Sequence, residues 1–198
     1  MNLALFDFDG TITYGDTFSV FVRDTVSPGR LVAGQLLLAP LIAGYKLGVV
    51  SGSLLRTRVT GFGFRGLRED DIRRAGIRYA REVLHGVVRP QALERILWHK
   101  AQGDVVVVVS ASLDMYLTHW CRHHGLDLIC NELESRDGVL TGRYRHGDCH
   151  SDEKARRILA RYDVSDFPTV YAYGDTREDL AMLDLAHKKY FRWREVVD

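Results

Sequence analysis

Cysteine is scarce in this chain of 198 residues, which contains only Cys121, Cys130 and Cys149. Three cysteines cannot build a disulfide framework, and a reducing cytoplasm is the simplest compartment for such a protein. An apolar leader is also missing, because Asp7 and Asp9 stand where a secretion signal would be apolar. We therefore expect a cytoplasmic protein without a secretion signal.

Neither charge is in marked excess, since the formal net charge is +1. Ten arginines do gather between Arg56 and Arg95. Most of them fit solvated helix faces, and an anionic substrate or membrane surface is the alternative. They are not accompanied by a nucleic-acid reader motif, so we expect no nucleic-acid partner. The composition gives no indication of the oligomeric state.

A hydrophobic run long enough to cross a membrane is absent. The uncharged run from Leu31 to Tyr45 is shorter than the about 20 residues that a membrane-spanning helix needs, and it carries Gln35 and Pro40. Pro40 predicts two buried helical pieces hinged at that position. The alternative is peripheral contact of Leu31 to Tyr45 with a membrane surface.

Zinc-binding patterns are missing as well. His146, Cys149 and His150 lie close together in the sequence, but no CxxC or HExxH motif accompanies them. We therefore do not expect a zinc site there.

The first eleven residues, MNLALFDFDGT, combine an apolar run with two aspartates. The run from Leu3 to Phe6 fits a strand that is buried on both faces, as in a parallel sheet. Side chains two apart on a strand point the same way, so Asp7 and Asp9 can project together where the strand ends. Gly10 allows a sharp turn there. Two like charges held so close favour a bound metal ion.

Strands and helices alternate from about Arg89 onward, and the run of five valines from Val105 to Val109 is the clearest buried strand. This alternation predicts an α/β core of residues 1–13 and 89–198, with a Rossmann-like parallel sheet and helices on both faces. Residues 14–88 show only helical patterns and predict a helical cap over the carboxyl edge of the sheet. Residues 133–144, with Asp137-Gly138 between their halves, predict a small β-hairpin.

Four polar groups fall at strand ends or helix starts in this scheme: Asp7 with Asp9, Ser110, Lys154, and Asp175 with Asp179. Phosphoryl transfer needs a nucleophile, neutralisation of the phosphoryl oxygens and a proton for the leaving oxygen. A carboxylate can be that nucleophile, and Asp7 and Asp175 can supply carboxylates to Mg²⁺.

Ser110 ends the valine strand, so its hydroxyl and the following amides can donate to a phosphate. The alternative for Ser110 or Ser112 is a helix N-cap, which we prefer for Ser112. Lys154 lies in the first turn of a helix, where the dipole disfavours a cation, and a bound phosphate would relieve that conflict. Taken alone, Lys154 would be an ordinary surface residue.

The chain resembles the haloacid dehalogenase superfamily of phosphohydrolases through four motifs that come in the family's order. DFDGT at residues 7–11 matches DxDxT, and the valine strand ending in Ser110 matches the second motif. Lys154 in SDEKARRI matches the third motif, and GDTRED at residues 174–179 matches the fourth, GDxxxD. A helical insertion directly after the first motif is similar to the phosphoserine-phosphatase-like group, subfamily IB.

The resemblance implies a role for each motif residue. Asp7 would be the nucleophile and a Mg²⁺ ligand. Asp9 would be the general acid and base and would offer its backbone carbonyl to the metal. Asp175 would be a third ligand and Asp179 would support the metal shell. The phosphoryl group would be bound by Thr11, Ser110 and Lys154. Because only a phosphatase must protonate an alkoxide, Asp9 favours a phosphatase over a dehalogenase.

Residues outside the motifs bear on the substrate. Phosphoserine phosphatases carry an acidic residue for the substrate amine and a cap arginine for its carboxylate, which Asp16 and Arg58 would represent here. Glu178 stands where that group usually has asparagine. The apolar run from Leu31 to Tyr45 is longer than a serine-sized cap needs, and it looks more like phosphatases acting on lipid head-group phosphates.

We therefore expect a Mg²⁺-dependent phosphatase that hydrolyses a small organic phosphate monoester through an aspartyl-phosphate. The first alternative is a membrane-associated lipid head-group phosphatase with the same chemistry. The second is a non-catalytic phosphate-binding module, which would have no need of Asp9.

Overall fold

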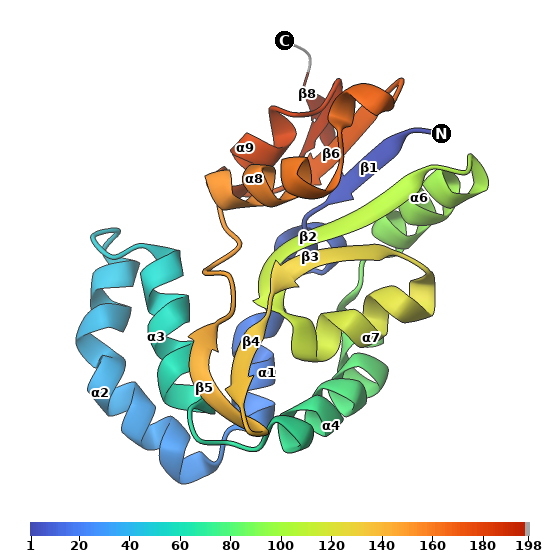
Figure 1. The fold of residues 1–198 in the computed structure, drawn as a ribbon. Helices are drawn as coiled ribbons and strands as arrows, with labels where there is room; N and C mark the ends of the chain where they lie inside the picture. Colours follow the sequence, from blue (N-terminus) through green and yellow to red (C-terminus); the bar gives the residue numbers. More distant parts are fainter. Residues whose placement is uncertain (197–198) are drawn as a thin grey trace.

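A computed structural model describes residues 1–196, which form an α/β core and a projecting helical arm of residues 28–64 (Figure 1). The central sheet has the strand order β3-β2-β1-β6-β7-β8, in which β8 alone is antiparallel to its neighbour. Its strands are β1 (Leu3–Phe6), β2 (Val105–Leu113), β3 (Asp127–Asn131), β6 (Val170–Gly174), β7 (Lys188–Phe191) and β8 (Arg194–Val196). Phe6 pairs with Val108 and Tyr173, so the carboxyl ends of β1, β2 and β6 meet at one edge.

Both faces of the sheet are covered, as the near-continuous apolar strands predict. Ala4 and Phe6 belong to the hydrophobic cluster that holds the buried side chains of α6 (Pro90–Ala101) and α7 (Asp114–His124). Leu3 and Leu5 belong to a second cluster that includes buried side chains of α8 (Asp152–Arg161) and α9 (Leu180–Leu183). The alternation along β1 thus sends successive side chains into two separate cores, and the predicted fold class is confirmed.

The chain between β1 and α6 is almost entirely helical. After a tight turn at Phe8–Ile12 it forms α1 (Thr17–Thr25), α2 (Pro28–Lys46), α3 (Gly52–Phe64), α4 (Glu69–Tyr79), a wider turn at Ala80–Leu84 and α5 (His85–Val87). An isolated bridge between Thr13 and Val88 joins the points where this segment leaves the core and returns. The cap boundaries at residues 14 and 88 stay a prediction that this bridge supports.

The predicted hairpin forms from β4 (Leu133–Arg136) and β5 (Val139–Tyr144), which make a separate antiparallel pair. The hydroxyls of Thr60 on α3 and Tyr144 on β5 lie 2.8 Å apart. Figure 1 shows the hairpin between α3 and the core, where β5 packs against α3.

The segment from Leu31 to Tyr45 differs from the prediction. It belongs to the single helix α2, with Pro40 inside it, and only Gly34 and Gly44 of that helix are buried. Leu36 and Leu37 are 74% and 65% exposed. Pro40 removes the intrahelical donor for the carbonyl of Leu36, and in an exposed helix water can satisfy that carbonyl without a break. The prediction of two buried, hinged pieces was wrong.

Candidate active site

Three aspartates converge at the carboxyl edge of the sheet. Asp7 directly follows β1, Asp175 directly follows β6, and Asp179 ends the short helical turn Arg177–Asp179. Each offers a carboxylate oxygen, and these oxygens lie within 4.8 Å of one another. Asp7 and Asp175 are 168 positions apart in the sequence (175 − 7), and the parallel strands β1 and β6 end side by side and bring them together. The motifs at strand ends predicted this proximity.

Lys154 forms ion pairs with two of these carboxylates. Its ammonium nitrogen lies 2.6 Å from Asp7 Oδ1 and 2.6 Å from Asp179 Oδ1, and its side chain is 2% exposed. Burial alone would lower the pKa of Lys154, but the two carboxylates outweigh that effect and raise it. Lys154 is therefore a fixed positive charge and not the surface residue that its position alone would suggest.

Two glycines allow the acidic groups to approach so closely. A Cβ at Gly10, where φ is +88°, would lie 2.4 Å from a carboxylate oxygen of Asp175. A Cβ at Gly174 would lie 2.5 Å from the Cβ of Asp179. Asp179 in turn accepts hydrogen bonds from the backbone amides of Asp175 and Thr176, at 3.1 and 3.0 Å. Its carboxylate thus fixes the turn that carries Asp175.

In the described part of the chain, the three carboxylates of Asp7, Asp175 and Asp179 outnumber the ammonium group of Lys154, and the Arg192 guanidinium donates only to the backbone carbonyl of Asp175, at 3.0 Å. Burial raises the pKa of Asp7 to about 8 even though Lys154 opposes the rise. Burial, followed by the nearby charge of Asp179, also raises the pKa of Asp175. For Asp179 burial acts in the same direction, but Lys154 and the amide donors outweigh it and lower the pKa. The excess negative charge and the all-oxygen donors fit a hard divalent cation such as Mg²⁺.

Asp9 is held by a different set of neighbours. Its Oδ1 accepts hydrogen bonds from the amide and the hydroxyl of Thr17, both at 2.6 Å, and its Oδ2 accepts one from the hydroxyl of Ser112. The Tyr116 hydroxyl lies 3.0 Å from that of Thr17. Burial raises the pKa of Asp9 against the effect of these donors, and a raised pKa fits the predicted role of Asp9 in proton transfer.

Thr17, Ser112 and Tyr116 form the surroundings of Asp9, and the sequence did not reveal them. Our preference for Ser112 as a helix N-cap was wrong, because Leu113 is the N-cap residue of α7 and the Ser112 hydroxyl binds Asp9. The sequence contained no clear signal for this contact, because β2 continues past the valines to Leu113 and its pairing with β3 shifts register after Val109.

Ser110 and Thr11 also lie at the site. Ser110 is buried beside Asp7 and Lys154 in the lining of one pocket, and its hydroxyl accepts a hydrogen bond from the amide of Ser112 at 3.0 Å. The Thr11 hydroxyl donates to Asp175 Oδ1 at 3.2 Å. Thr11 is thus placed to orient an aspartate, and its contact with a phosphoryl group stays a prediction.

The pocket above the aspartates has a volume of about 680 Å³ and reaches from the core to the helical arm. Asp16 lies on its rim and accepts a hydrogen bond from the Ser19 amide as the N-cap of α1. Arg58, the predicted cap arginine, is exposed and is not among the lining residues, whereas Arg56 is. The substrate role of Arg58 thus stays a prediction, and its exposed position outside the pocket does not support it.

Arg56 connects α3 to the core across this pocket. Its guanidinium donates to Asp148 at 3.0 Å and to Glu178 at 3.2 Å. Asp148 also accepts a hydrogen bond from the Asn131 side-chain amide at 2.6 Å. Two acidic groups therefore occupy the arginine that a substrate carboxylate would need.

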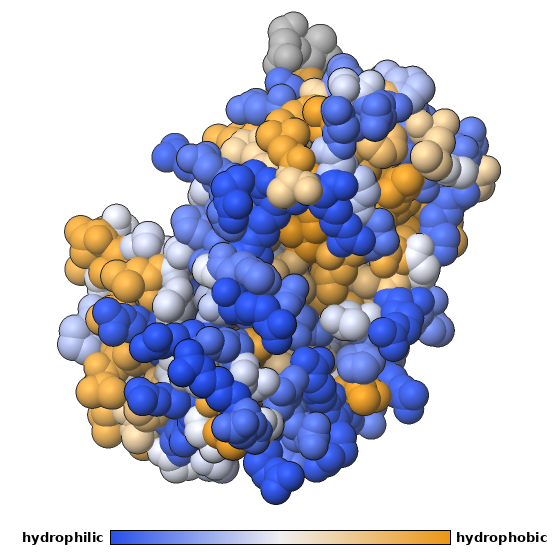
Figure 2. Space-filling view, viewed as in Figure 1, coloured by the Kyte–Doolittle hydropathy of each residue, from blue (hydrophilic) through white to orange (hydrophobic). Residues whose placement is uncertain are grey.

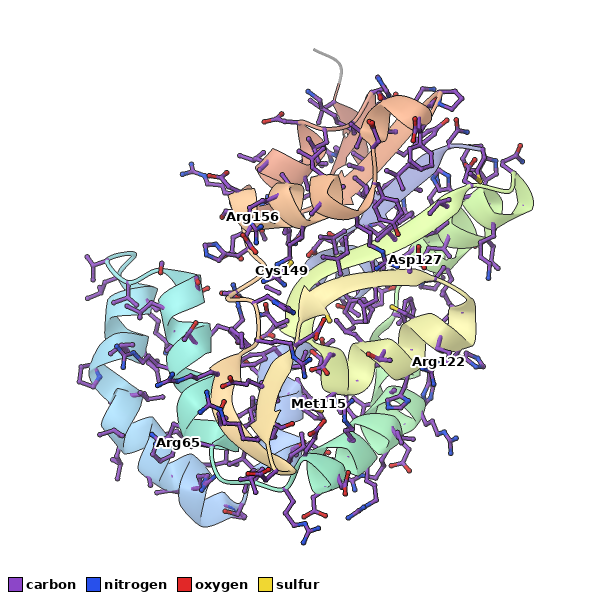
Figure 3. All side chains as sticks on the ribbon, viewed as in Figure 1. Arg65, Met115, Arg122, Asp127, Cys149 and Arg156 are labelled. Atoms are coloured by element: carbon purple, nitrogen blue, oxygen red, sulfur yellow. The ribbon has the colours of Figure 1, made fainter. Side chains whose placement is uncertain are left out.

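A larger cavity of about 880 Å³ lies away from the aspartates, along the sheet edge at β3. Arg122, Asp127 and Arg156, labelled in Figure 3, are among its lining residues. Arg157 and Arg161 donate to the carbonyls of Cys130 and Leu128. These contacts cover the open edge of the sheet. This structural role explains the presence of Arg157 and Arg161 without invoking a bound ligand.

Within residues 1–196, the aspartate cluster is the one group of acidic, histidine or cysteine side chains that could hold a metal. Cys149, labelled in Figure 3, is a buried free thiol in the loop before α8. His146, Cys149 and His150 do not form such a group.

The fold and the site define a hydrolase of the α/β type, with paired carboxylates at a strand end and a helical cap. The family of haloacid dehalogenase-like hydrolases matches residues 4–184, and the chain belongs to that family. Protein CicA of Caulobacter vibrioides is 31% identical over 192 residues, which cover 96% of this chain and 85% of that protein.

Solved structures show the same fold. A protein of unknown function from Bordetella pertussis Tohama I superimposes with a TM-score of 0.79 at 22% identity, covering 96% of this chain and 88% of the other. A phosphoserine phosphatase, described as a phospho-aspartyl intermediate analogue, gives a TM-score of 0.67 at 21% identity and covers 96% and 85%. At these identities the likeness concerns the fold alone.

Proposed function

We propose that the protein is a Mg²⁺-dependent phosphatase that hydrolyses phosphate monoesters through an aspartyl-phosphate on Asp7. The observation that carries this proposal is the separation of the two carboxylates of the first motif. Asp7 accepts a hydrogen bond from Lys154, which also contacts Asp179. The carboxylate of Asp9 instead accepts hydrogen bonds from Thr17 and Ser112. This separation supports a division of roles in which one carboxylate attacks phosphorus and the other transfers a proton. The fold likeness to phosphoserine phosphatases supports this assignment.

In the first step, a carboxylate oxygen of Asp7 attacks phosphorus and the bond from phosphorus to the ester oxygen breaks. The leaving oxygen takes a proton from Asp9. In the second step, water attacks the phosphorus of the aspartyl-phosphate and gives a proton to Asp9, and the bond to Asp7 breaks. Ser110 and Lys154 donate to the phosphoryl oxygens.

A magnesium ion would be held by Asp7, Asp175 and the backbone carbonyl of Asp9, with Asp179 in support, and it would neutralise phosphoryl charge. The pocket of about 680 Å³ accommodates a small organic phosphate. The three buried free thiols support our proposal of a reducing, cytoplasmic location.

Purified protein should hydrolyse p-nitrophenyl phosphate with Mg²⁺, should lose this activity in EDTA and should regain it when Mg²⁺ is added. Stopping the reaction in acid should trap a phosphoryl group on the peptide that contains Asp7, and hydroxylamine should remove it. Turnover without any trapped phosphoryl group would contradict the aspartyl-phosphate. An absence of turnover across a broad panel of phosphate esters would instead favour a non-catalytic phosphate-binding module.

A membrane-associated lipid head-group phosphatase is the second candidate, and the surface of the helical arm favours it. Figure 2 shows apolar residues gathered on the arm, over α2 and the loop that follows it. The large apolar side chains exposed there are Val32, Leu36, Leu37, Tyr45, Leu47 and Val49. Residues 25–68 contain six arginines and lysines and no acid. Apolar exposure within a basic segment suits peripheral contact with anionic lipid. Within residues 1–196, no helix has the length and apolarity needed to cross a membrane.

We expect the protein to float with vesicles of phosphatidylglycerol and phosphatidylcholine in a density gradient. The double variant Leu36→Asp/Leu37→Asp should remain at the bottom, because it places two charges in the contact face. Leu97→Asp is the matched control, since Leu97 on α6 is 62% exposed but lies outside the arm. A parent protein that does not float would contradict membrane contact through α2.

A further inference from the structure

An apolar groove lies between α1, α2 and α3, with a volume of about 260 Å³. No acidic side chain lines it, and its two charged residues are Arg23 and Arg30. Arg30 is already engaged, because its guanidinium donates to the carbonyls of Gly63 and Arg65, each at 3.0 Å. The apolar side chains that form most of its walls include Val22, Leu31, Leu38, Ile42, Val59 and Phe62. Such a lining suits an uncharged, apolar occupant.

The groove adjoins the catalytic pocket. Ser19 and Val59 line both of them, and Phe18 and Leu55 give the pocket an apolar wall. Along α1 the groove extends from Ser19 to Val26, which is about 10 Å at 1.5 Å per helical residue. A substrate whose phosphate lies at Asp7 therefore has an apolar space next to it for the rest of the molecule.

The two sides of α2 differ in what they face. Leu31, Leu38 and Ile42 line the groove, whereas Leu36 and Leu37 are exposed on the outside of the arm. A helix that is apolar all round normally has partners on every side. The groove side of α2 is thus a separate feature from its outward surface, and it needs an occupant of its own.

A second protein segment fits this space poorly. An α-helix with its side chains is about 10–12 Å wide, which is too wide for a groove of about 260 Å³ between three helices. A single hydrocarbon chain is narrow, requires no polar partners and gains free energy with each methylene removed from water.

We infer that the substrate is a phosphate monoester with a hydrocarbon chain, and that the chain lies in the groove between α1, α2 and α3. The inference rests on the proposed phosphatase function and adds the substrate class. Because the chain contacts the groove equally before and during reaction, its length affects KM and leaves kcat unchanged.

The test is a series of straight-chain alkyl phosphates from ethyl to dodecyl, each below its aggregation concentration. We expect kcat/KM to rise about fourfold with each methylene that enters the groove, and to level off once the groove is filled. A flat series with good turnover of ethyl phosphate and p-nitrophenyl phosphate would overturn this inference and leave the proposed function standing. Absence of all turnover would overturn both.

Leu38→Trp fills the groove, and Leu37→Trp on the outside of the same helix is its matched control. Leu38→Trp should flatten the series, and Leu37→Trp should leave both the series and the p-nitrophenyl phosphate turnover as in the parent. Ile42→Ser, which adds a hydroxyl without overpacking, should reduce the slope. A steep series in Leu38→Trp would overturn the inference. A flat parent series together with a dimer that Leu38→Trp dissociates would also overturn the inference. The groove would then hold a second copy of the chain.

Discussion

Asp7→Asn should lower kcat for p-nitrophenyl phosphate by about 10⁴-fold or more, because an amide cannot form the acyl-phosphate. The fold should survive. Burial raises the pKa of Asp7 to about 8, so at pH 7 the metal-free fold disfavours its charged form. Replacing the carboxylate by a neutral amide removes that penalty, and the amide oxygen can still accept from Lys154. We therefore expect the Tm without Mg²⁺ to be equal to or above that of the parent.

The same variant should lose most of the rise in Tm that Mg²⁺ causes in the parent, because one of the carboxylates that hold the ion is gone. Asp152→Asn is the matched control, since Asp152 is exposed in the first turn of α8, two positions before Lys154. It should keep both activity and the Mg²⁺ effect. Undiminished turnover by Asp7→Asn would show that Asp7 is not the nucleophile.

Those parts of the site that follow a buried strand could be predicted from the sequence. The apolar runs before Asp7 and Asp175 are continuous, and neighbouring parallel strands bring their ends to one edge. The position of Lys154 in a first helical turn predicted a bound phosphate, which stays a prediction, and the carboxylate partners Asp7 and Asp179 were not predicted. Periodicity and motif order were sufficient for the strand ends because they depend on local geometry and topology.

Contacts set by the rotation of a helix could not be predicted in this way. Arg56 and Arg58 are two positions apart, about 200° around a helix, and α3 carries apolar residues without a clear stripe. Which arginine faces the pocket is decided by how α3 packs on β5. The exposure of α2 could not be predicted either, because it results from α2 packing against α3 on one side while its other side faces solvent. The short strand β8 was missed because its three exposed residues, from Arg194 to Val196, carry no strand pattern and pair only with β7.

Lys154→Met should be the most destabilising of these changes. Methionine keeps the length of the side chain but removes the charge that Asp7 and Asp179 share at 2.6 Å. Removing one partner of a buried ion pair leaves uncompensated charge and costs about 3–5 kcal/mol of the free energy of unfolding. Urea denaturation at pH 7 without Mg²⁺ measures this loss. Lys46→Met, an exposed lysine at the end of α2, should be within error of the parent.

The defect in Lys154→Met should shrink as the pH falls. Without the ammonium group, the folded state raises the pKa of the clustered carboxyls above their unfolded value of about 3.9. The folded state then binds more protons than the unfolded state, so stability increases as the pH decreases. The parent should behave differently at Asp179, because Lys154 and the amide donors hold its pKa low in the fold. That contribution is complete above the unfolded pKa and is lost as the pH falls through the folded one.

Mg²⁺ and a second substitution separate charge compensation from packing. Mg²⁺ should recover part of the lost stability, since it supplies positive charge to the same oxygens. Lys154→Met/Asp179→Asn should be more stable than Lys154→Met alone, because it removes one of the unpaired charges, and the difference gives the coupling energy of the pair. If Lys154→Met is instead as unstable at pH 5 as at pH 7, and neither Mg²⁺ nor the second substitution improves it, then packing and not charge holds Lys154 in the site.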